Sequence, residues 1–68
     1  MAMLTIDLRN GRTDDQLRKL ASALLDAVSR TTGEPRENVF LVIHENRGFN
    51  FVENGEHLPD VVRASSNG

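Results

Sequence analysis

The chain has 68 residues with 38% hydrophobic content and no cysteine, so it forms one small domain that no disulfide can stabilise. Because its two histidines, His44 and His57, form no paired ligand motif, we expect no metal to stabilise the fold, which leaves oligomerisation as the remedy. The net charge of −2 and the absence of a basic run argue against nucleic-acid binding, and the lack of a signal peptide or of an apolar run of about 20 residues favours a cytoplasmic protein.

The first predicted element is a strand over residues 4–9, where apolar and polar side chains alternate with the period of a half-buried strand. Residues 10–16 then contain the turn dipeptide Asn-Gly and the Thr-x-x-Gln pattern of a helix capping box. Arg9 and Arg12 therefore lie at one strand-to-helix corner, where two guanidinium groups can clamp a carboxylate. The alternative is that Arg9 is only the polar side of the strand and that Arg12 only decorates the turn.

A helix is predicted from about Asp14 to about Thr32, because apolar residues recur at helical spacing and Gly33 and Pro35 follow where a helix ends. The apolar stripe of this helix consists of Leu17, Leu20, Ala21, Leu24 and Val28. Three more apolar residues widen it beyond what a two-stranded sheet can cover, namely Ala23, Leu25 and Ala27. We interpret the surplus as a contact with another subunit, although an alanine-rich helix would show the same pattern.

Residues 39–43 form a nearly continuous apolar run rich in β-branched side chains, which is typical of a strand buried on both faces in a parallel pair. Strand, helix and strand in this order make a β-α-β unit with a right-handed crossover. Two parallel strands cannot cover both faces of so apolar a strand, and an oligomer is the simplest source of the missing cover.

The C-terminal third of the chain predicts a short hairpin. Residues 49–53 can form a strand, and Asn54-Gly55 is a strong hairpin-turn dipeptide. Residues 56–63 continue as an arm, and residues 64–68 have the composition of a flexible tail. The expected fold class is α/β (α+β): one domain over residues 1–63, with a single β-α-β unit, a parallel strand pair and a short C-terminal hairpin.

Glu53 is the candidate for proton transfer, because Phe51 and Val52 precede it in an otherwise apolar segment. A carboxylate in apolar surroundings holds a proton more readily than a solvated one, which suits a general acid or base near neutral pH. The alternative is a solvated charge on an edge strand, which is a common device against aggregation.

Three segments, residues 9–14, 32–38 and 50–60, resemble the tautomerase superfamily, the small β-α-β proteins typified by 4-oxalocrotonate tautomerase. More narrowly, the chain is similar to the α subunits of trans-3-chloroacrylic acid dehalogenases, and the segment 50–60 is quite specific to that subunit type. The resemblance spans roughly residues 3–60, which is nearly the whole chain.

This resemblance implies a heterohexamer of three α and three β chains with no metal or cofactor, acting on 3-haloacrylates by hydrolytic dehalogenation to malonate semialdehyde, or as a hydratase. Arg9 and Arg12 match the arginines that bind and polarise the substrate carboxylate, and Glu53 matches the glutamate that activates water. Phe40 and Phe51 match apolar walls of the pocket.

The chain departs from the superfamily at its amino terminus, where Ala2 stands in place of the catalytic proline. In the resembled heterohexamer that proline comes from the β chain, so an α-like chain needs a proline-bearing partner. A second hypothesis is a proline-less homohexamer that, if Met1 is removed, works through the primary amine of Ala2. A third is a non-enzymatic oligomer that keeps an anion-binding pocket.

Overall fold

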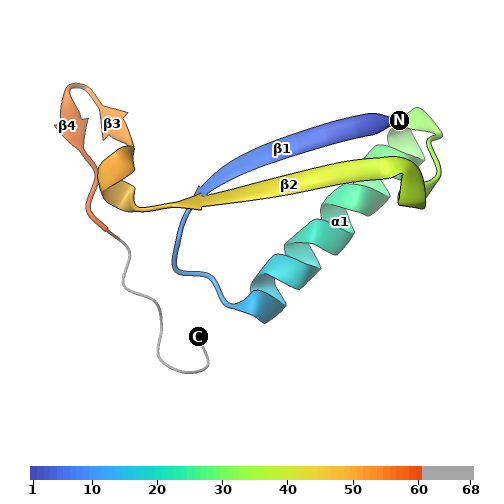
Figure 1. Ribbon diagram of the computed structural model, residues 1–68, viewed down its shortest axis with the longest axis horizontal. Helices are drawn as coiled ribbons and strands as arrows, with labels where there is room; N and C mark the ends of the chain where they lie inside the picture. The colour runs from blue at the N-terminus through green and yellow to red at the C-terminus, as the bar shows by residue number, and fades with distance from the viewer. Residues whose placement is uncertain (61–68) are drawn as a thin grey trace.

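The structure is a computed structural model, and it describes residues 1–60 of the chain (Figure 1). Its elements in chain order are β1 (Ala2–Arg9), α1 (Asp14–Thr32), η1 (Arg36–Asn38), β2 (Val39–Asn46), η2 (Gly48–Asn50), β3 (Val52–Glu53) and β4 (Glu56–His57). No helix within residues 1–60 is long and apolar enough to cross a membrane. The predicted tail over 64–68, and residues 61–63 of the predicted domain, lie outside the described part of the chain.

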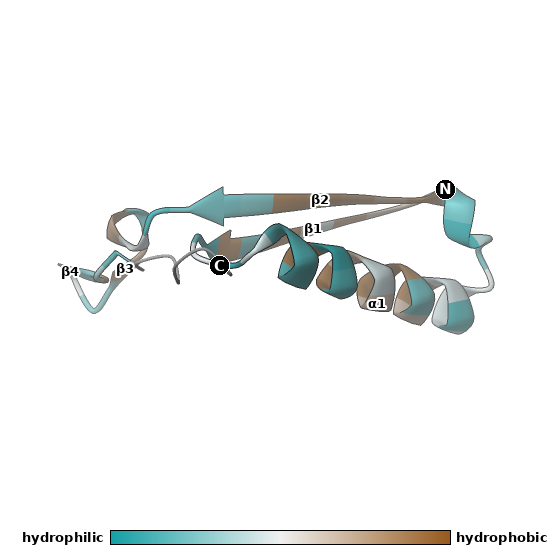
Figure 2. Cartoon of the chain, turned by 90° about the horizontal axis from the view of Figure 1, so that it is seen from below, coloured by the Kyte–Doolittle hydropathy of each residue, from teal (hydrophilic) through white to brown (hydrophobic). Residues whose placement is uncertain are grey.

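Strands β1 and β2 pair in parallel over their whole length, from Ala2 opposite Val39 to Arg9 opposite Asn46. Helix α1 connects them and packs along one face, so that the two layers of the fold are one sheet and one helix (Figure 2). This confirms the predicted β-α-β unit and its parallel strand pair. Both strands are longer than predicted: β1 begins two residues earlier, at Ala2, and β2 continues through the polar residues His44, Glu45 and Asn46, because the pairing of the two strands spans these positions.

Local sequence signals set both ends of α1. The Thr13 hydroxyl accepts a hydrogen bond from the Gln16 backbone N–H (3.0 Å), and the Gln16 side chain accepts one from the Thr13 N–H (2.9 Å). At the other end Gly33 has a φ of 81°, and its N–H donates to the Ser29 carbonyl (2.9 Å). The predicted capping box and the predicted C-terminal glycine are both confirmed.

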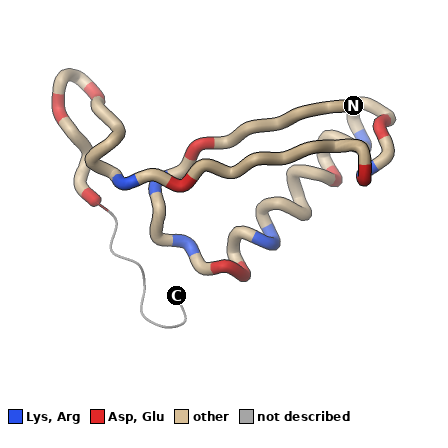
Figure 3. The backbone as a smooth tube through the Cα atoms, in the orientation of Figure 1, with Lys and Arg blue, Asp and Glu red and all other residues tan. Residues whose placement is uncertain are grey.

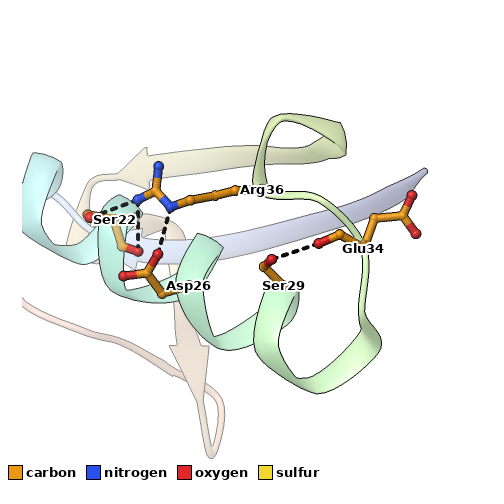
Figure 4. Close-up of polar contacts among 5 residues, drawn as sticks. All are labelled: Ser22, Asp26, Ser29, Glu34 and Arg36. Carbon is orange, nitrogen blue, oxygen red and sulfur yellow. Dashed lines mark hydrogen bonds and ion pairs between the residues drawn. The ribbon is translucent and has the colours of Figure 1, made fainter.

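The connection from α1 to β2 is held on the helix by side chains (Figure 4). The Arg36 guanidinium donates to Asp26 Oδ1 (2.6 Å) and to Ser22 Oγ (2.9 Å). The Ser29 hydroxyl donates to the Glu34 carbonyl (2.7 Å). These contacts tie the connection to α1 shortly before β2 begins at Val39.

The segment after β2 differs from the prediction of a continuous strand over 49–53. Residues 48–50 form the short helix η2, since the Asn50 N–H donates to the Arg47 carbonyl (3.0 Å) and the Phe51 N–H to that of Gly48 (2.9 Å). These local hydrogen bonds occupy donors that a strand would have presented to a neighbour. Only Val52–Glu53 is strand, and it pairs antiparallel with Glu56–His57.

The predicted hairpin turn at Asn54-Gly55 is confirmed. Asn54 has a φ of 54° and Gly55 a φ of 81°. Two successive residues with positive φ are the requirement of a type I′ turn, whose twist matches that of antiparallel strands. The hairpin stands beyond the end of the β1–β2 sheet, apart from α1 (Figure 1).

The single chain leaves one face of its sheet open. Of the described hydrophobic residues only Val39 is buried, whereas Met3 and Phe40, which are register partners, are 70% and 53% exposed. Farther along the same face, His44 Nδ1 lies 3.1 Å from Asp7 Oδ1. This agrees with the prediction that the chain alone cannot cover both faces of β2; that another subunit covers the open face stays a prediction.

Candidate functional site

Two arginines gather where β1 turns into α1, and we call residues 9–12 the arginine corner. Arg9 is the last residue of β1, and Arg12 directly precedes the helix cap. Gly11 has a φ of 122°, a backbone conformation that favours glycine, and the chain reverses there. Arg12 Nη1 donates to the Arg9 carbonyl (2.8 Å), which folds its side chain back over the corner.

A hydrogen bond joins the arginine corner to the end of the described chain. Arg9 Nη1 donates to the Pro59 carbonyl (3.1 Å), across fifty residues of sequence. Pro59 belongs to the rim of a surface depression that the C-terminal hairpin forms. That depression is lined by Glu53, Asn54, Glu56, His57, Leu58 and Pro59.

The charge of the arginine corner has no counterion among residues 1–60. Arg9 and Arg12 donate to backbone carbonyls, which orient a guanidinium without neutralising it. Three other described arginines are instead ion-paired, as Arg18–Asp15, Arg36–Asp26 and Arg47–Asp60. In Figure 3 several Lys and Arg positions, in blue, lie around the end of the sheet opposite the N-terminus, where the arginine corner is. The corner can therefore attract an anion.

Glu53 lines the same depression, but its surroundings differ from the prediction. It is exposed in the single chain, so the expected desolvation between apolar neighbours is not found there. Its register partner in the hairpin is Glu56, which places two carboxylates on one face. No side chain among residues 1–60 buries Glu53.

Phe51 lies at the base of this hairpin and is half-buried. Its carbonyl accepts a hydrogen bond from the Leu58 N–H (2.9 Å), which closes the hairpin. Of the residues singled out from the sequence, the contacts place Arg12 beside Arg9 and join Arg9, through the Pro59 carbonyl, to the segment that follows the hairpin of Glu53. Phe51 stands at the base of that hairpin.

Phe40 and Ala2 lie elsewhere. Both stand at the start of the sheet, where Phe40 is the register partner of Met3. Seven residue steps at about 3.3 Å each put Ala2 roughly 23 Å from Arg9 along β1. Within one chain neither residue reaches the depression beside Glu53.

Sequence reasoning missed a cluster that holds the hairpin. Asp60 Oδ2 accepts from Arg47 Nη2 (2.9 Å) and Asp60 Oδ1 from the Phe49 N–H (3.1 Å). The hydrogen bond from Arg47, followed by that from Phe49, holds the pKa of Asp60 below its ordinary value. No spacing rule links residues thirteen apart across a short helix and a hairpin, so no sequence signal identifies this pair.

A second missed residue is Asn10, inside the arginine corner. Its N–H donates to the Asn46 carbonyl (2.7 Å), which extends the pairing of β1 with β2 by one hydrogen bond. Its side-chain Oδ1 is buried and has no donor among the described residues. Over residues 1–60, no group of three His, Asp or Glu side chains is placed to hold a metal ion.

Comparison with known proteins agrees with this architecture. Residues 3–60 match the family described as "Tautomerase enzyme". The 2-hydroxymuconate tautomerase of Bacillus subtilis is 34% identical over 61 residues, which are 90% of this chain and 98% of that protein.

Two solved structures extend the comparison. Trans-3-chloroacrylic acid dehalogenase, covalently inactivated by the mechanism-based inhibitor 3-bromopropiolate, is 60% identical with a TM-score of 0.78, over 88% of this chain and 98% of that one. A heterohexamer 4-oxalocrotonate tautomerase from Chloroflexus aurantiacus is 30% identical with a TM-score of 0.80, over 84% of this chain and 92% of that one. The chain belongs to the tautomerase family.

Proposed function

We propose that the chain is the α-type subunit of a cofactor-independent enzyme that hydrolyses 3-haloacrylate-type unsaturated carboxylates. The observation that carries this proposal is the hydrogen bond from Arg9 Nη1 to the Pro59 carbonyl (3.1 Å), which joins the arginine corner to the depression that Glu53 lines. The 60% identity with trans-3-chloroacrylic acid dehalogenase supports the reaction class. Hydration of other unsaturated acids would use the same groups.

In this proposal Arg9 and Arg12 bind the substrate carboxylate. An arginine has five N–H donors, and each of these two gives one to a backbone carbonyl, so several remain for bidentate contacts with an anion. Two cations at the carboxylate draw electron density toward the acid end of the conjugated system. The carbon that bears the halogen, C3, thereby becomes electrophilic.

Glu53 acts as the general base in this scheme. Its carboxylate takes a proton from water while the water oxygen bonds to C3, and the electron pair of the double bond moves to C2. A proton donor then protonates C2. The resulting halohydrin loses the halide together with its hydroxyl proton, which leaves malonate semialdehyde.

The proton donor for C2 is the group that we assign to a partner chain. Ala2 stands where the superfamily carries its catalytic proline, and it lies roughly 23 Å from Arg9 along β1. Phe40 lies at the same far end, so its role as an apolar wall would be played in a site shared with a neighbouring subunit. The heterohexamer from Chloroflexus aurantiacus supports an assembly of unlike homologous chains, and we expect a hexamer here.

A second candidate is a homohexamer that works through an amino-terminal amine. The placement of Ala2 at the first position of β1, opposite Val39, favours it, because removal of Met1 would leave a primary amine at a fixed end of the sheet. With Met1 present, the terminal ammonium is that of Met1 and pairs with Glu34 Oε2 (3.2 Å). Trapping with borohydride and a carbonyl substrate distinguishes this candidate. It predicts a covalent adduct on the Ala2 nitrogen, which requires that Met1 be removed.

Halide release tests the leading proposal. We expect no chloride from trans-3-chloroacrylate with this chain alone, and chloride after it is assembled with the homologous proline-bearing chain of its own host. Chloride release by the chain alone would contradict the need for a partner. Binding of small carboxylates without turnover, in both preparations, would favour a non-enzymatic anion-binding oligomer.

A further inference from the structure

The carbonyl of Pro59 is a meeting point for distant parts of the chain. It accepts the hydrogen bond from Arg9 Nη1 (3.1 Å) and at the same time lies against the backbone of Gly48, which is buried. A Cβ at position 48 would overlap this carbonyl group, lying 2.6 Å from its carbon. Only glycine at 48 lets the Pro59 carbonyl take the position in which it meets Arg9.

Asp60 holds the next residue of the same segment. Its two carboxylate oxygens accept from Arg47 Nη2 (2.9 Å) and from the Phe49 N–H (3.1 Å), so that one side chain spans both sides of Gly48. These hydrogen bonds hold the Pro59–Asp60 peptide in contact with the backbone of Gly48. Both hydrogen bonds are charge-assisted, because the acceptor is an ionised carboxylate.

His57 secures the segment on the other side of Pro59. Its Nδ1 lies 2.7 Å from the Phe49 carbonyl, which only accepts, so Nδ1 is the donor. Its ring stacks on that of Phe49, with 3.9 Å between centroids and 7° between planes. Residues 57–60 are therefore fixed on residues 47–49, and the hairpin that carries Glu53 rises between them.

We propose that Arg47, Gly48 and Asp60 form a clasp that positions Arg9 and Glu53 relative to each other. The inference rests on the function proposed above. The Pro59 carbonyl orients the guanidinium of Arg9 while leaving its charge for a substrate carboxylate. The same clasp fixes the end of the hairpin nearest the sheet. It thereby sets the distance between the bound substrate carboxylate and Glu53, which activates water. The three clasp residues are positioning residues, since none of them touches the proposed reacting atoms.

The clasp lies outside the layers that form the fold. Its hydrogen bonds run within residues 47–60 and, through Pro59, to Arg9 at the very end of β1. The pairing of β1 with β2 and the caps of α1 involve none of its side chains. Loss of the clasp should therefore displace the reacting groups before it unfolds the protein, which matters because small displacements are costly in catalysis.

Substitution of Gly48 by alanine tests the clasp in the assembled enzyme with its partner chain. We expect Gly48→Ala to lower kcat/KM by at least about tenfold, with KM raised through Arg9 and kcat lowered through Glu53. Gly33→Ala is the control for adding a methyl group at a glycine: it meets no atom within 4 Å and lies at the far end of the sheet, so the strain at its positive φ lowers the stability of the helix end without touching the clasp. It should change kcat/KM less than about twofold. Equal effects of the two substitutions would overturn the clasp.

If Gly48→Ala fails to fold, variants of Asp60 test the clasp instead. They add no atoms to the crowded contact between Gly48 and Pro59. Asp60→Ala should lower kcat/KM in the same direction, and Asp60→Asn should restore part of it, because an amide oxygen can still accept the Phe49 N–H. An Asp60→Asn variant no better than Asp60→Ala, or an Asp60→Ala variant with the wild-type kcat and KM, would overturn the proposal.

A measurement independent of turnover separates this inference from the proposed function. The side-chain N–H resonances of Arg9, assigned with Arg9→Lys, should shift and broaden in Gly48→Ala and stay unchanged in Gly33→Ala. Unchanged Arg9 resonances in Gly48→Ala would overturn the clasp whatever the enzyme does. Shifted resonances in a protein that releases no halide would support the clasp as a structural device and contradict the function.

Discussion

The arginine corner and the Glu53 hairpin, residues 52–57, meet through Pro59, yet they are built in different ways. The corner depends on near neighbours: a turn glycine, a capping box, and an Arg12 side chain that returns to a carbonyl three residues away. The hairpin stands on contacts between distant residues, chiefly Arg47 with Asp60 and Arg9 with Pro59. The difference teaches that this chain fixes Arg12 through near neighbours, whereas Arg9 and the hairpin of Glu53 take their positions only in the completed fold.

The largest expected effect is on the hairpin side. Glu53→Gln removes the general base and should lower kcat by about 100-fold or more in the assembled enzyme, because general-base catalysis contributes on the order of 10² to 10⁴. Substrate binding through the arginine corner should persist. Glu56→Gln is the matched control on the same face of the hairpin, and it should change halide release little. Turnover unaffected by Glu53→Gln would remove Glu53 from the mechanism.

A substitution in the arginine corner should weaken the binding of the substrate carboxylate and so lower kcat/KM. Arg12→Ala removes a charged donor to the substrate carboxylate, and hydrogen bonds to charged groups contribute about 1.5–3 kcal/mol, so kcat/KM should fall about 10- to 100-fold. Arg18→Ala serves as the control, because that arginine is exposed and paired with Asp15 on α1. If the two substitutions weaken carboxylate binding equally, the arginine corner is not the anion site.

Acidic pH should separate the two regions. Arg47 and Phe49 hold the pKa of Asp60 below its ordinary value, so the folded form gains stability from this carboxylate above its unfolded pKa. That stability is lost as the pH falls through the lower, folded pKa. We expect the amide resonance of Phe49 to move in this acidic range while that of Gln16, in the capping box, does not. Asp60→Asn should abolish the transition, and a transition that persists in this variant would assign it to another group.

The smallest effect should be purely structural and confined to the corner. Thr13→Ala removes the side-chain acceptor of the capping box and should cost about 1 kcal/mol of stability. Chemical denaturation at one fixed protein concentration measures it, since stability and assembly are coupled in an oligomer. The kcat of the folded enzyme should be unchanged. A large fall in kcat with intact stability would mean that the cap positions Arg12.

What could be predicted from the sequence follows the same division. The capping box at Thr13 and the turn at Asn54-Gly55 involve residues two or three apart, and both predictions are confirmed. The strand predicted through Phe49 was wrong, because the chain bends into η2 where Gly48 meets Pro59. That contact joins residues eleven apart and depends on the absence of a side chain, which no periodicity reveals.

The surroundings of Glu53 could not be predicted for another reason. Its apolar neighbours in sequence suggested a desolvated carboxylate, yet the residue is exposed in the single chain. Met3 and Phe40, on the open face of the sheet, are likewise apolar residues that the described chain leaves exposed. In the proposed oligomer other chains would cover these residues, and the pattern of one sequence does not specify such contacts.

In the proposed function this chain holds only part of a catalytic site, and a homologous chain supplies the proline. Native mass spectrometry of the tagged chain, recovered from its own host, tests the claim most directly. We predict one hexamer that contains two chain masses, the second from a homologous chain whose mature amino terminus is proline. A hexamer of this chain alone would contradict the account, and the mass of its subunit would show whether Met1 remains or Ala2 presents the free amine.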